Sequence, residues 1–462
     1  MNEMGLSVTE STCGAKTIAS ALPKGKALFW IGELSQIALE RCATVRCAID
    51  TMGELAVKHG FYGEQEVEGS GETLLLADTN ESWVFSILSS PCGSSAVWCA
   101  QRVPDDHVTV VANMYTIRNV DLNDSSTFRY SENMLDVARE QKWWNGSLPF
   151  DFTRAFSSGE YGHPYYTGRR VWRVLSLMAP SLNLDATLGV RTDRATYPWS
   201  VKAEKKVSLS MLRELNRDHY EDTPYDLTKG MAAGPFNSPN RLDGGSRFFP
   251  QPKGAWERPI AMYRTSYSLI AAPRDSSTTS GGVIFYAPHN PHASVYVPFF
   301  QLAAGHQDAI PEPYSQGSQG TFSYFTSIGN AWWAANIIMN WMDKMYVFMS
   351  GDVNDAQERF ETTADELLMA MDIQAELVRE LKSATTSAVT QKHLDKNFRD
   401  LLALTSNRHA SDRAHDWWEL AGNLTQKFND GYLNDPTVGE ITGYPAWWLE
   451  RVGYTEFPKP PP

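Results

Sequence analysis

The sequence has no excess of positive charge, no long hydrophobic run and few cysteines. Its 462 residues include 54 Asp and Glu against 41 Lys and Arg, which gives a formal net charge of −13. Nucleic-acid-binding proteins gather Lys and Arg on one face, so we expect no DNA or RNA partner. No run of eighteen apolar residues occurs, and the start lacks the layout of a signal peptide. We therefore expect a soluble chain with no transmembrane segment. A lysosome-like or secreted location would require a signal upstream of Met1.

The cysteines are odd in number and lie close together in the sequence. All five fall within the first hundred residues: Cys13, Cys42, Cys47, Cys92 and Cys99. An odd set cannot pair completely within one chain, so we expect no disulfide scaffold. Cys42 shares the apolar face of a helical pattern, which predicts a small core residue rather than a reactive thiol.

Motifs for cofactors and metals are also lacking. No glycine-rich loop leads from a strand into a helix, and Gly-x-Ser-x-Gly is absent apart from the polar, loop-like segment 68–71. His289 and His292 flank a turn-forming Asn-Pro pair, and nothing nearby has ligand spacing. We interpret both as surface histidines of a turn. The sequence thus predicts no metal, no cofactor and no serine-hydrolase elbow.

Helical and strand patterns follow one another in blocks. The opening residues 1–13 alternate as in a strand, and 31–56 carry apolar residues at three- and four-residue steps, as one helix or two. Segments 72–78, 82–89, 96–103 and 107–113 then indicate an antiparallel meander. Helices are expected at 133–144, 165–178 and 208–218, and strands at 265–271, 282–287 and 293–298. This order predicts an α+β protein of two stacked sheets with helices outside.

The character of the chain changes near residue 330. Residues 330–348 are aromatic and apolar, and 353–383 carry one apolar stripe, which indicates helices. The last residues, 457–462, are rich in proline and predict a solvated tail. We therefore expect a core of sheets and helices over 1–325, a helical extension over 326–435, and a C-terminal segment over 436–462.

Three polar positions stand out as candidates for chemistry. Asn113 ends the apolar run 107–112, so a rigid strand can present its amide to a developing oxyanion, although it can equally terminate a strand and bond its own turn. Arg241 follows a loop with two prolines, and its fixed charge can stabilise a thiolate or bind a carboxylate, or it can face solvent. Thr12 and Cys13 end the opening strand. A thiol there needs a partner that the spacing does not supply, which favours a structural Cys13.

Taken together, several segments resemble the cysteine dipeptidases of the dipeptidase A family, relatives of secernins within the N-terminal-nucleophile hydrolases. The resemblance covers nearly the whole chain. It rests on residues 1–3 and 10–13, 26–29, 39–41, 60–64, 111–114, 234–235 with 238–241, and Gly443-Tyr444-Pro445-Ala446-Trp447-Trp448.

The resemblance implies an αββα sandwich in which a cysteine, exposed as the first residue of the mature chain, attacks a peptide carbonyl. Its own α-amine takes the thiol proton, so no histidine or metal is required. By similarity, Asn113 would contribute to the oxyanion site, Arg241 would lie beside the thiolate, and Thr12 would line the same site. A dipeptide or short peptide is the implied substrate.

This sequence departs from the family pattern at its start. Family members carry the nucleophile upstream of the Asn-Glu segment that Asn2 and Glu3 match, and Cys13 falls beyond the nucleophile. We therefore expect a chain truncated at the N-terminus and inactive alone. The alternatives are a non-catalytic peptide-binding or scaffold remnant, and a chain in which Cys13 replaces the nucleophile. Missing strands would expose sheet edges, which predicts poor solubility or a homo-oligomer.

Overall fold

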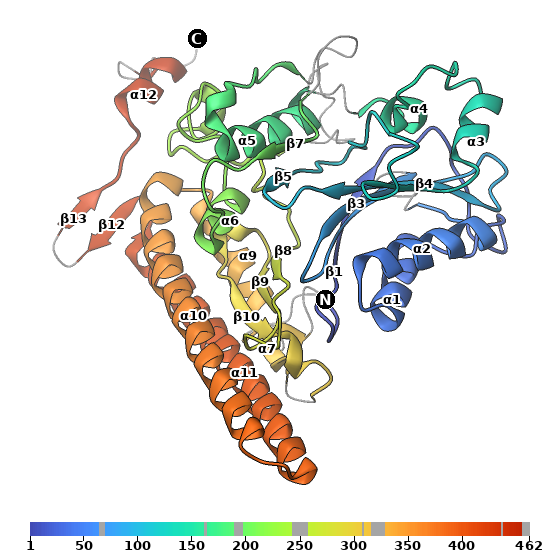
Figure 1. Ribbon diagram of the computed structural model, residues 1–462. Coiled ribbons are helices and arrows are strands. Elements are labelled where there is room, and N and C mark those ends of the chain that lie inside the picture. The colour runs from blue at the N-terminus through green and yellow to red at the C-terminus, as the bar shows by residue number, and fades with distance from the viewer. Residues whose placement is uncertain are drawn as a thin grey trace. The chain divides into compact units, whose positions relative to one another are not determined.

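The computed structural model describes residues 1–63, 70–160, 164–188, 197–242, 257–306, 309–315, 329–435 and 438–454. The chain forms two compact units. The first consists of Met1–Ser208 with Pro273–Ser277, and the second of Leu209–Ala272 with Thr278–Pro462. Both combine helices and strands, so the α+β class is confirmed (Figure 1). The αββα stacking of sheets stays a prediction. The boundary expected between residues 325 and 326 lies outside the described residues, and the three-part division likewise stays a prediction.

The first unit is built on a five-stranded antiparallel sheet. Its order is β1-β2-β3-β4-β6, formed by β1 (Ser7–Cys13), β2 (Gly71–Ala77), β3 (Ser82–Ser89), β4 (Ala96–Val103) and β6 (Phe128–Tyr130). The meander expected over 72–103 is therefore confirmed. Its expected fourth strand is not part of it, because β5 (His107–Thr109) pairs instead with β7 (Ser200–Lys202), some ninety residues away in sequence.

Apolar side chains of these strands point alternately to the two faces of the sheet, and helices cover both faces. Leu74 and Phe85 point to one face, where they pack on α1 (Ile31–Arg41) and α2 (Val45–His59). Val84 and Leu88 point to the other face, where they pack on α3 (Met134–Glu140) and α4 (Phe152–Phe156) (Figure 1). Successive side chains of a strand alternate between faces, so one sheet serves two cores. The helical region over 31–56 thus contains two helices.

A disulfide joins the two helices on the first face. Cys42 is buried, as expected for a core residue, and its sulfur bonds that of Cys47. The prediction of a core residue is therefore confirmed, and the bond to Cys47 is a feature that the sequence patterns did not predict. The connection between α1 and α2 is short, and it brings the two Cα atoms to 5.5 Å, a separation that suits a disulfide. Cys13, Cys92 and Cys99 are free thiols.

The second unit packs a small sheet against long helices. The sheet order is β10-β9-β8, from β8 (Tyr267–Ala272), β9 (Val283–Pro288) and β10 (Val297–Phe300). Its apolar side chains meet those of α9 (Ala331–Met342), α10 (Tyr346–Ser383) and α11 (Ala388–Lys427). The remaining described elements are α5 (Arg169–Met178), α6 (Leu209–Asn216), α7 (Glu312–Ser315), β11 (Phe428–Asn429), β12 (Tyr432–Asp435), β13 (Val438–Ile441), α12 (Ala446–Val452), a π-helical turn at Pro164–Gly168, and 3₁₀ turns at Pro180–Leu182, Met231–Ala233, Pro291–Ala293 and Gln301–Ala303.

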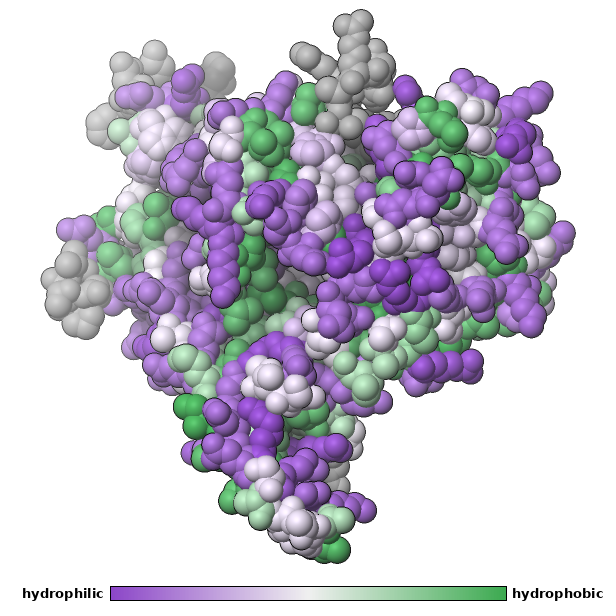
Figure 2. All heavy atoms as spheres, in the orientation of Figure 1, coloured by the Kyte–Doolittle hydropathy of each residue, from purple (hydrophilic) through white to green (hydrophobic). Residues whose placement is uncertain are grey.

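Helices α10 and α11 form a long antiparallel hairpin (Figure 1). Lys382 and Asp395 form an ion pair at 2.7 Å near its turn, and Ser387 caps α11 by accepting a hydrogen bond from the Thr390 amide. Hydrophobic patches lie between hydrophilic side chains along this hairpin (Figure 2). Among the helices that the structure describes, none is long and apolar enough to cross a membrane. The expected proline-rich tail lies outside the described residues.

Candidate active site

The end of β1 brings together two of the three predicted site residues. The Nδ2 of Asn113 donates a hydrogen bond to the backbone carbonyl of Thr12 at 2.9 Å, although about a hundred residues separate them in sequence. Both side chains are half-buried. The Thr12 hydroxyl itself donates to Glu10 at 3.0 Å. Asn113 therefore forms a hydrogen bond to a neighbouring strand. The alternative interpretation was an asparagine that bonds only its own turn.

The backbone fixes the direction of the Asn113 amide. Asn113 has φ of 55°, in the left-handed region that asparagine tolerates better than most residues. Its backbone N–H donates to the hydroxyl of Ser11 at 3.0 Å. Two hydrogen bonds to β1 hold the residue, so the carboxamide cannot swing freely. Such fixed donors suit the stabilisation of developing negative charge.

Arg170 completes the contacts of Asn113 and was missed in the sequence. Its Nη2 donates to Oδ1 of Asn113 at 3.0 Å, and its Nε donates to the carbonyl of Tyr166 at 2.8 Å. The guanidinium lies over the Tyr166 ring, 5.3 Å from the centroid. Donation from a cation to Oδ1 polarises the amide and makes its Nδ2 hydrogens better donors. The only signal in the sequence was a pair of arginines in the helix expected over 165–178.

Cys13 lies beside this cluster but has a poor environment for a nucleophile. It is 2% exposed, and its Sγ lies 3.2 Å from the carbonyl oxygen of Ser11 and 3.4 Å from Oγ1 of Thr73, within hydrogen-bonding distance of both. Burial raises the pKa of the Cys13 thiol well above its usual value, and the nearby carboxylate of Glu160 raises it further. The thiol therefore stays protonated near neutral pH. This geometry favours the structural interpretation of Cys13 over a replacement nucleophile.

Glu160 places a negative charge at the end of β1. Its Oε1 accepts from the backbone N–H of Gly14 at 2.7 Å, and its Oε2 accepts from the hydroxyls of Ser157 and Ser158 at 2.8 and 3.0 Å. These bonds fix the carboxylate within the first unit. Together with Asn113 and Arg170, it gives the site a fixed amide donor, a cation and an anion.

Arg241 belongs to the second unit, where it organises a loop. It is 7% exposed, so the solvent-facing alternative is wrong. Its guanidinium donates to the backbone carbonyls of Ser238, Asn240 and Leu227, at 2.8, 3.1 and 2.6 Å. Burial lowers the pKa of Arg241 from its usual value, and the charge of Asp343 opposes that shift. Its role beside a thiolate stays a prediction.

The histidines assigned to a surface turn are buried. His289 is 3% exposed and His292 5% exposed, so that interpretation was wrong. The Asn-Pro turn does exist, as a 3₁₀ turn at Pro291–Ala293, but it packs inside the second unit rather than on its surface. Tertiary packing therefore decided the burial. Within the described ranges, no group of three or more His, Cys, Asp or Glu side chains is placed to hold a metal ion.

Comparison with known proteins identifies the family of the chain. The family model described as "Peptidase family C69" matches residues 1–359. The chain therefore belongs to peptidase family C69.

The relatives that resemble the chain carry dipeptidase names. A "Probable dipeptidase" of Salmonella dublin is 25% identical over 301 residues, 64% of this chain and 61% of the relative. A "Dipeptidase" of Bifidobacterium longum is 24% identical over 360 residues, 73% of this chain and 58% of the relative. A "Probable dipeptidase A" of Streptococcus pyogenes serotype M1 is 21% identical over 381 residues, 80% of this chain and 70% of the relative. The chain spans less than two thirds of the length of the first curated relatives that it matches: 61%, 43% and 34%.

Proposed function

We propose that the protein to which this chain belongs hydrolyses dipeptides by a cysteine mechanism. The observation that carries the proposal is the family match over residues 1–359, supported by relatives named as dipeptidases. Peptide hydrolysis also suits the cluster at the end of β1, which offers a fixed amide donor where acyl transfer needs one.

The proposed chemistry follows the N-terminal-nucleophile scheme. The thiolate of a cysteine at the start of the mature chain attacks the peptide carbonyl carbon, and its α-amine takes the thiol proton and later gives it to the leaving amine. Water then hydrolyses the thioester and releases the acid. In this scheme the Nδ2 of Asn113 stabilises the oxyanion, Arg170 holds Asn113, and Thr12 lines the site. Arg241 is the proposed cation beside the thiolate.

The experiment assays the 462-residue chain, and any longer natural form of the protein, on a panel of dipeptides, with free amino acids measured by chromatography. In an active form, Asn113→Ala should lower kcat by roughly 100- to 1000-fold with little change in KM, as for loss of one oxyanion donor. Asn119→Ala is the matched control, because Asn119 is exposed and also has positive φ, 52°. Absence of dipeptide hydrolysis by every form assayed would refute the function. Equal effects of the two variants would refute only the role of Asn113.

A second candidate function is peptide binding without cleavage. The buried state of Cys13 and Cys99, each with a thiol pKa raised by burial, favours it for this chain. It predicts saturable heats of dipeptide binding by calorimetry and no turnover. Turnover by the 462-residue chain that persists in Cys13→Ala would exclude this candidate, and it would also exclude Cys13 as the nucleophile.

A further inference from the structure

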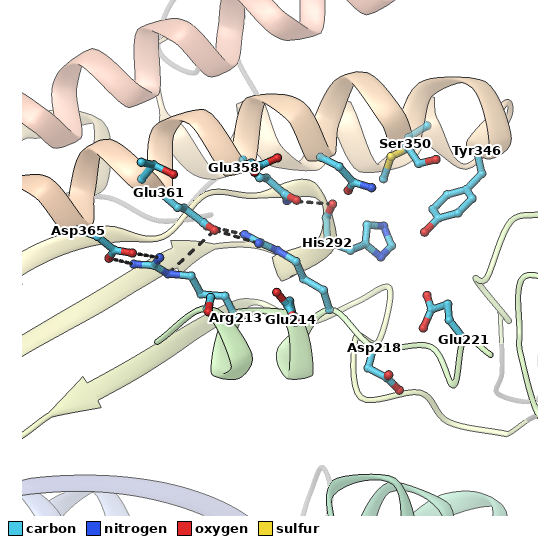
Figure 3. Close-up of a pocket in the computed structure, with 16 residues that line it drawn as sticks. Arg213, Glu214, Asp218, Glu221, His292, Tyr346, Ser350, Glu358, Glu361 and Asp365 are labelled. Atoms are coloured by element: carbon cyan, nitrogen blue, oxygen red, sulfur yellow. Dashed lines mark hydrogen bonds and ion pairs between the residues drawn. The ribbon is translucent and has the colours of Figure 1, made fainter. Parts of the chain in front are cut away.

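The second unit contains a charged cavity that the proposed hydrolysis does not use. Its volume is about 630 Å³, and its lining comes from α6, the segment after α6, the turn at Pro291–Ala293, and α9 and α10. Figure 3 shows the side chains of α10 facing those of α6 across it. Every lining residue belongs to the second unit, so one folded unit supplies the whole wall.

The lining carries more negative than positive charge. It includes six carboxylates and two guanidiniums. Arg213 donates to both carboxylate oxygens of Asp365, at 2.9 and 2.7 Å. Arg217 donates to both oxygens of Glu361, at 3.0 and 2.5 Å. Each cation is thus neutralised by a carboxylate of α10, and the wall as a whole retains an excess of negative charge. Such a wall attracts a cation and repels a carboxylate.

One buried nitrogen of the wall lacks a partner. His292 is 5% exposed, and in the part of the chain that the structure describes its Nε2 has no hydrogen-bond partner. The ring lies in the lining, beside Tyr346 in Figure 3. A buried polar atom without a partner costs about 1–3 kcal/mol, so such atoms are rare in native proteins and often mark a place where a ligand binds.

A chain of hydrogen bonds determines whether the free Nε2 of His292 is a donor or an acceptor toward a ligand. The Nδ1 of His219 lies 2.9 Å from Oε1 of Glu221, and its Nε2 lies 2.9 Å from Nδ1 of His292. A carboxylate only accepts, so Nδ1 of His219 donates to it. We assign one proton to the His219 ring, and its Nε2 then accepts from the Nδ1–H of His292. The remaining nitrogen, Nε2 of His292, therefore carries a lone pair. It calls for a ligand that donates an N–H or O–H.

The charge states agree with this assignment. Burial opposes ionisation of Glu221, but the hydrogen bonds from His219 outweigh it and lower the pKa of Glu221 below its usual value. Burial also lowers the pKa of His292 well below its usual value, and the charge of Arg217 acts in the same direction. His292 is therefore neutral near pH 7 and keeps its lone pair.

The other lining residues indicate which class of hydrogen-bond donor suits the cavity, and they favour an organic amine. The absence of a metal-holding group among the described residues argues against a metal ion as occupant. An ammonium group supplies three N–H donors and a positive charge, which suits both the lone pair of His292 and the surrounding carboxylates. The half-buried ring of Tyr346 faces the same space and adds an aromatic wall that favours a cation (Figure 3).

We propose that this cavity binds a small aliphatic diamine, with one ammonium group donating to Nε2 of His292 and the second lying among the carboxylates of α6 and α10. A carboxylate on the ligand is disfavoured, because both guanidiniums of the wall are already paired. The site is independent of the proposed hydrolysis and does not rest on it.

The test measures binding by calorimetry at pH 7.5 with three probes of similar length: 1,4-diaminobutane, butylamine and 4-aminobutanoate. We expect the diamine to bind more tightly than butylamine, 4-aminobutanoate not to bind measurably, and affinity to fall as salt is added. No heat with the diamine, or equal binding of 4-aminobutanoate, would overturn the proposal.

Variants then locate the site. Glu358→Gln on α10 should weaken diamine binding about 3- to 10-fold through loss of one charge. Glu366→Gln is the matched control, since Glu366 is exposed on the same helix but outside the lining, and should leave binding unchanged. His292→Phe should abolish binding. Nitrogen NMR of the folded wild-type protein provides a check that needs no variant, because the Nε2 signal of His292 must shift on addition of diamine. Equal effects of the two glutamate variants, or an unshifted signal, would refute the site.

Discussion

Cys92 is expected to be the reactive thiol of the chain, and the reason lies in its turn. Its Sγ lies 3.0 Å from the hydroxyl of Ser90 and 3.4 Å from that of Ser94, and the residue is exposed. The hydrogen bonds from Ser90 and then Ser94 lower the pKa of Cys92 from 9.0 to about 7. At pH 7 about half of Cys92 is thiolate, compared with about 1% of a thiol whose pKa is 9.

The lowered pKa increases the alkylation rate of Cys92 less than it increases the fraction of thiolate. Nucleophilicity falls with pKa, with a Brønsted coefficient of about 0.5, so two pKa units cost each thiolate about tenfold in reactivity. Cys92 should therefore react with iodoacetamide about fivefold faster at pH 7 than an ordinary exposed thiol. The buried Cys13 and Cys99 should react only after local unfolding, because the folded protein excludes the reagent.

The assay follows alkylation of each cysteine by peptide mass spectrometry between pH 5 and 10. Labelling of Cys92 should rise with a midpoint near 7, and Ser90→Ala should move that midpoint upward because it removes the larger stabilisation of the thiolate. Cys92→Ser is the control that removes the fast phase. A Cys92 midpoint near 9, or labelling of folded Cys13 at a similar rate, would refute this reasoning. The result matters for any thiol-inhibition test, since loss of activity on alkylation would have to be separated from modification of Cys92.

Further predictions concern stability. In urea unfolding, Asn113→Gly should be more stable than Asn113→Ala by about 1 kcal/mol. Alanine in the left-handed region costs about 1–2 kcal/mol, and the extra backbone entropy that glycine loses on folding offsets only part of this difference. The reverse order of stability would contradict the strained φ of residue 113. Glu361→Met should cost about 1–3 kcal/mol in thermal unfolding by leaving the half-buried Arg217 and the Tyr296 amide without this carboxylate, and the double change Glu361→Met with Arg217→Met should recover part of it. Burial lowers the pKa values of His289 and His409 to about 4, so between about pH 6.5 and 4 the unfolded state binds protons that the folded state does not. Stability should fall through that window by up to about 1.4 kcal/mol per pH unit for each histidine, and a flat urea-unfolding profile from pH 7 to 4.5 would contradict this.

Patterns of neighbouring residues predicted much of the secondary structure. The alternation in β2, β3 and β4 is a period of two, and it identified strands whose two faces pack on different helices. The helical period over 31–56 was equally clear, because α1 and α2 each bury one stripe. These features depend on residues close in sequence, so local physics determines them.

Contacts between distant residues could not be predicted in the same way. The pairing of β5 with β7 and the contact of Arg170 with Asn113 each join segments more than fifty residues apart. A periodic pattern says that a face is buried but not against what, and a lone arginine or histidine has no pattern at all. For this reason the two histidines of the Asn-Pro turn were assigned to the surface.

The sequence by itself therefore determined the α+β class, most of the strands and helices, and the resemblance to dipeptidases, since these reside in local periodicity and in short segments of fixed order. Only the tertiary structure decided which polar groups act together. In the folded chain Cys13 is buried and its thiol stays protonated. The side-chain amide of Asn113 is held by hydrogen bonds to Thr12 and Arg170, and His292 lies at the end of a chain of hydrogen bonds. The physical reason is that burial and hydrogen bonding, which set charge and direction, depend on neighbours that the chain brings together only when it folds.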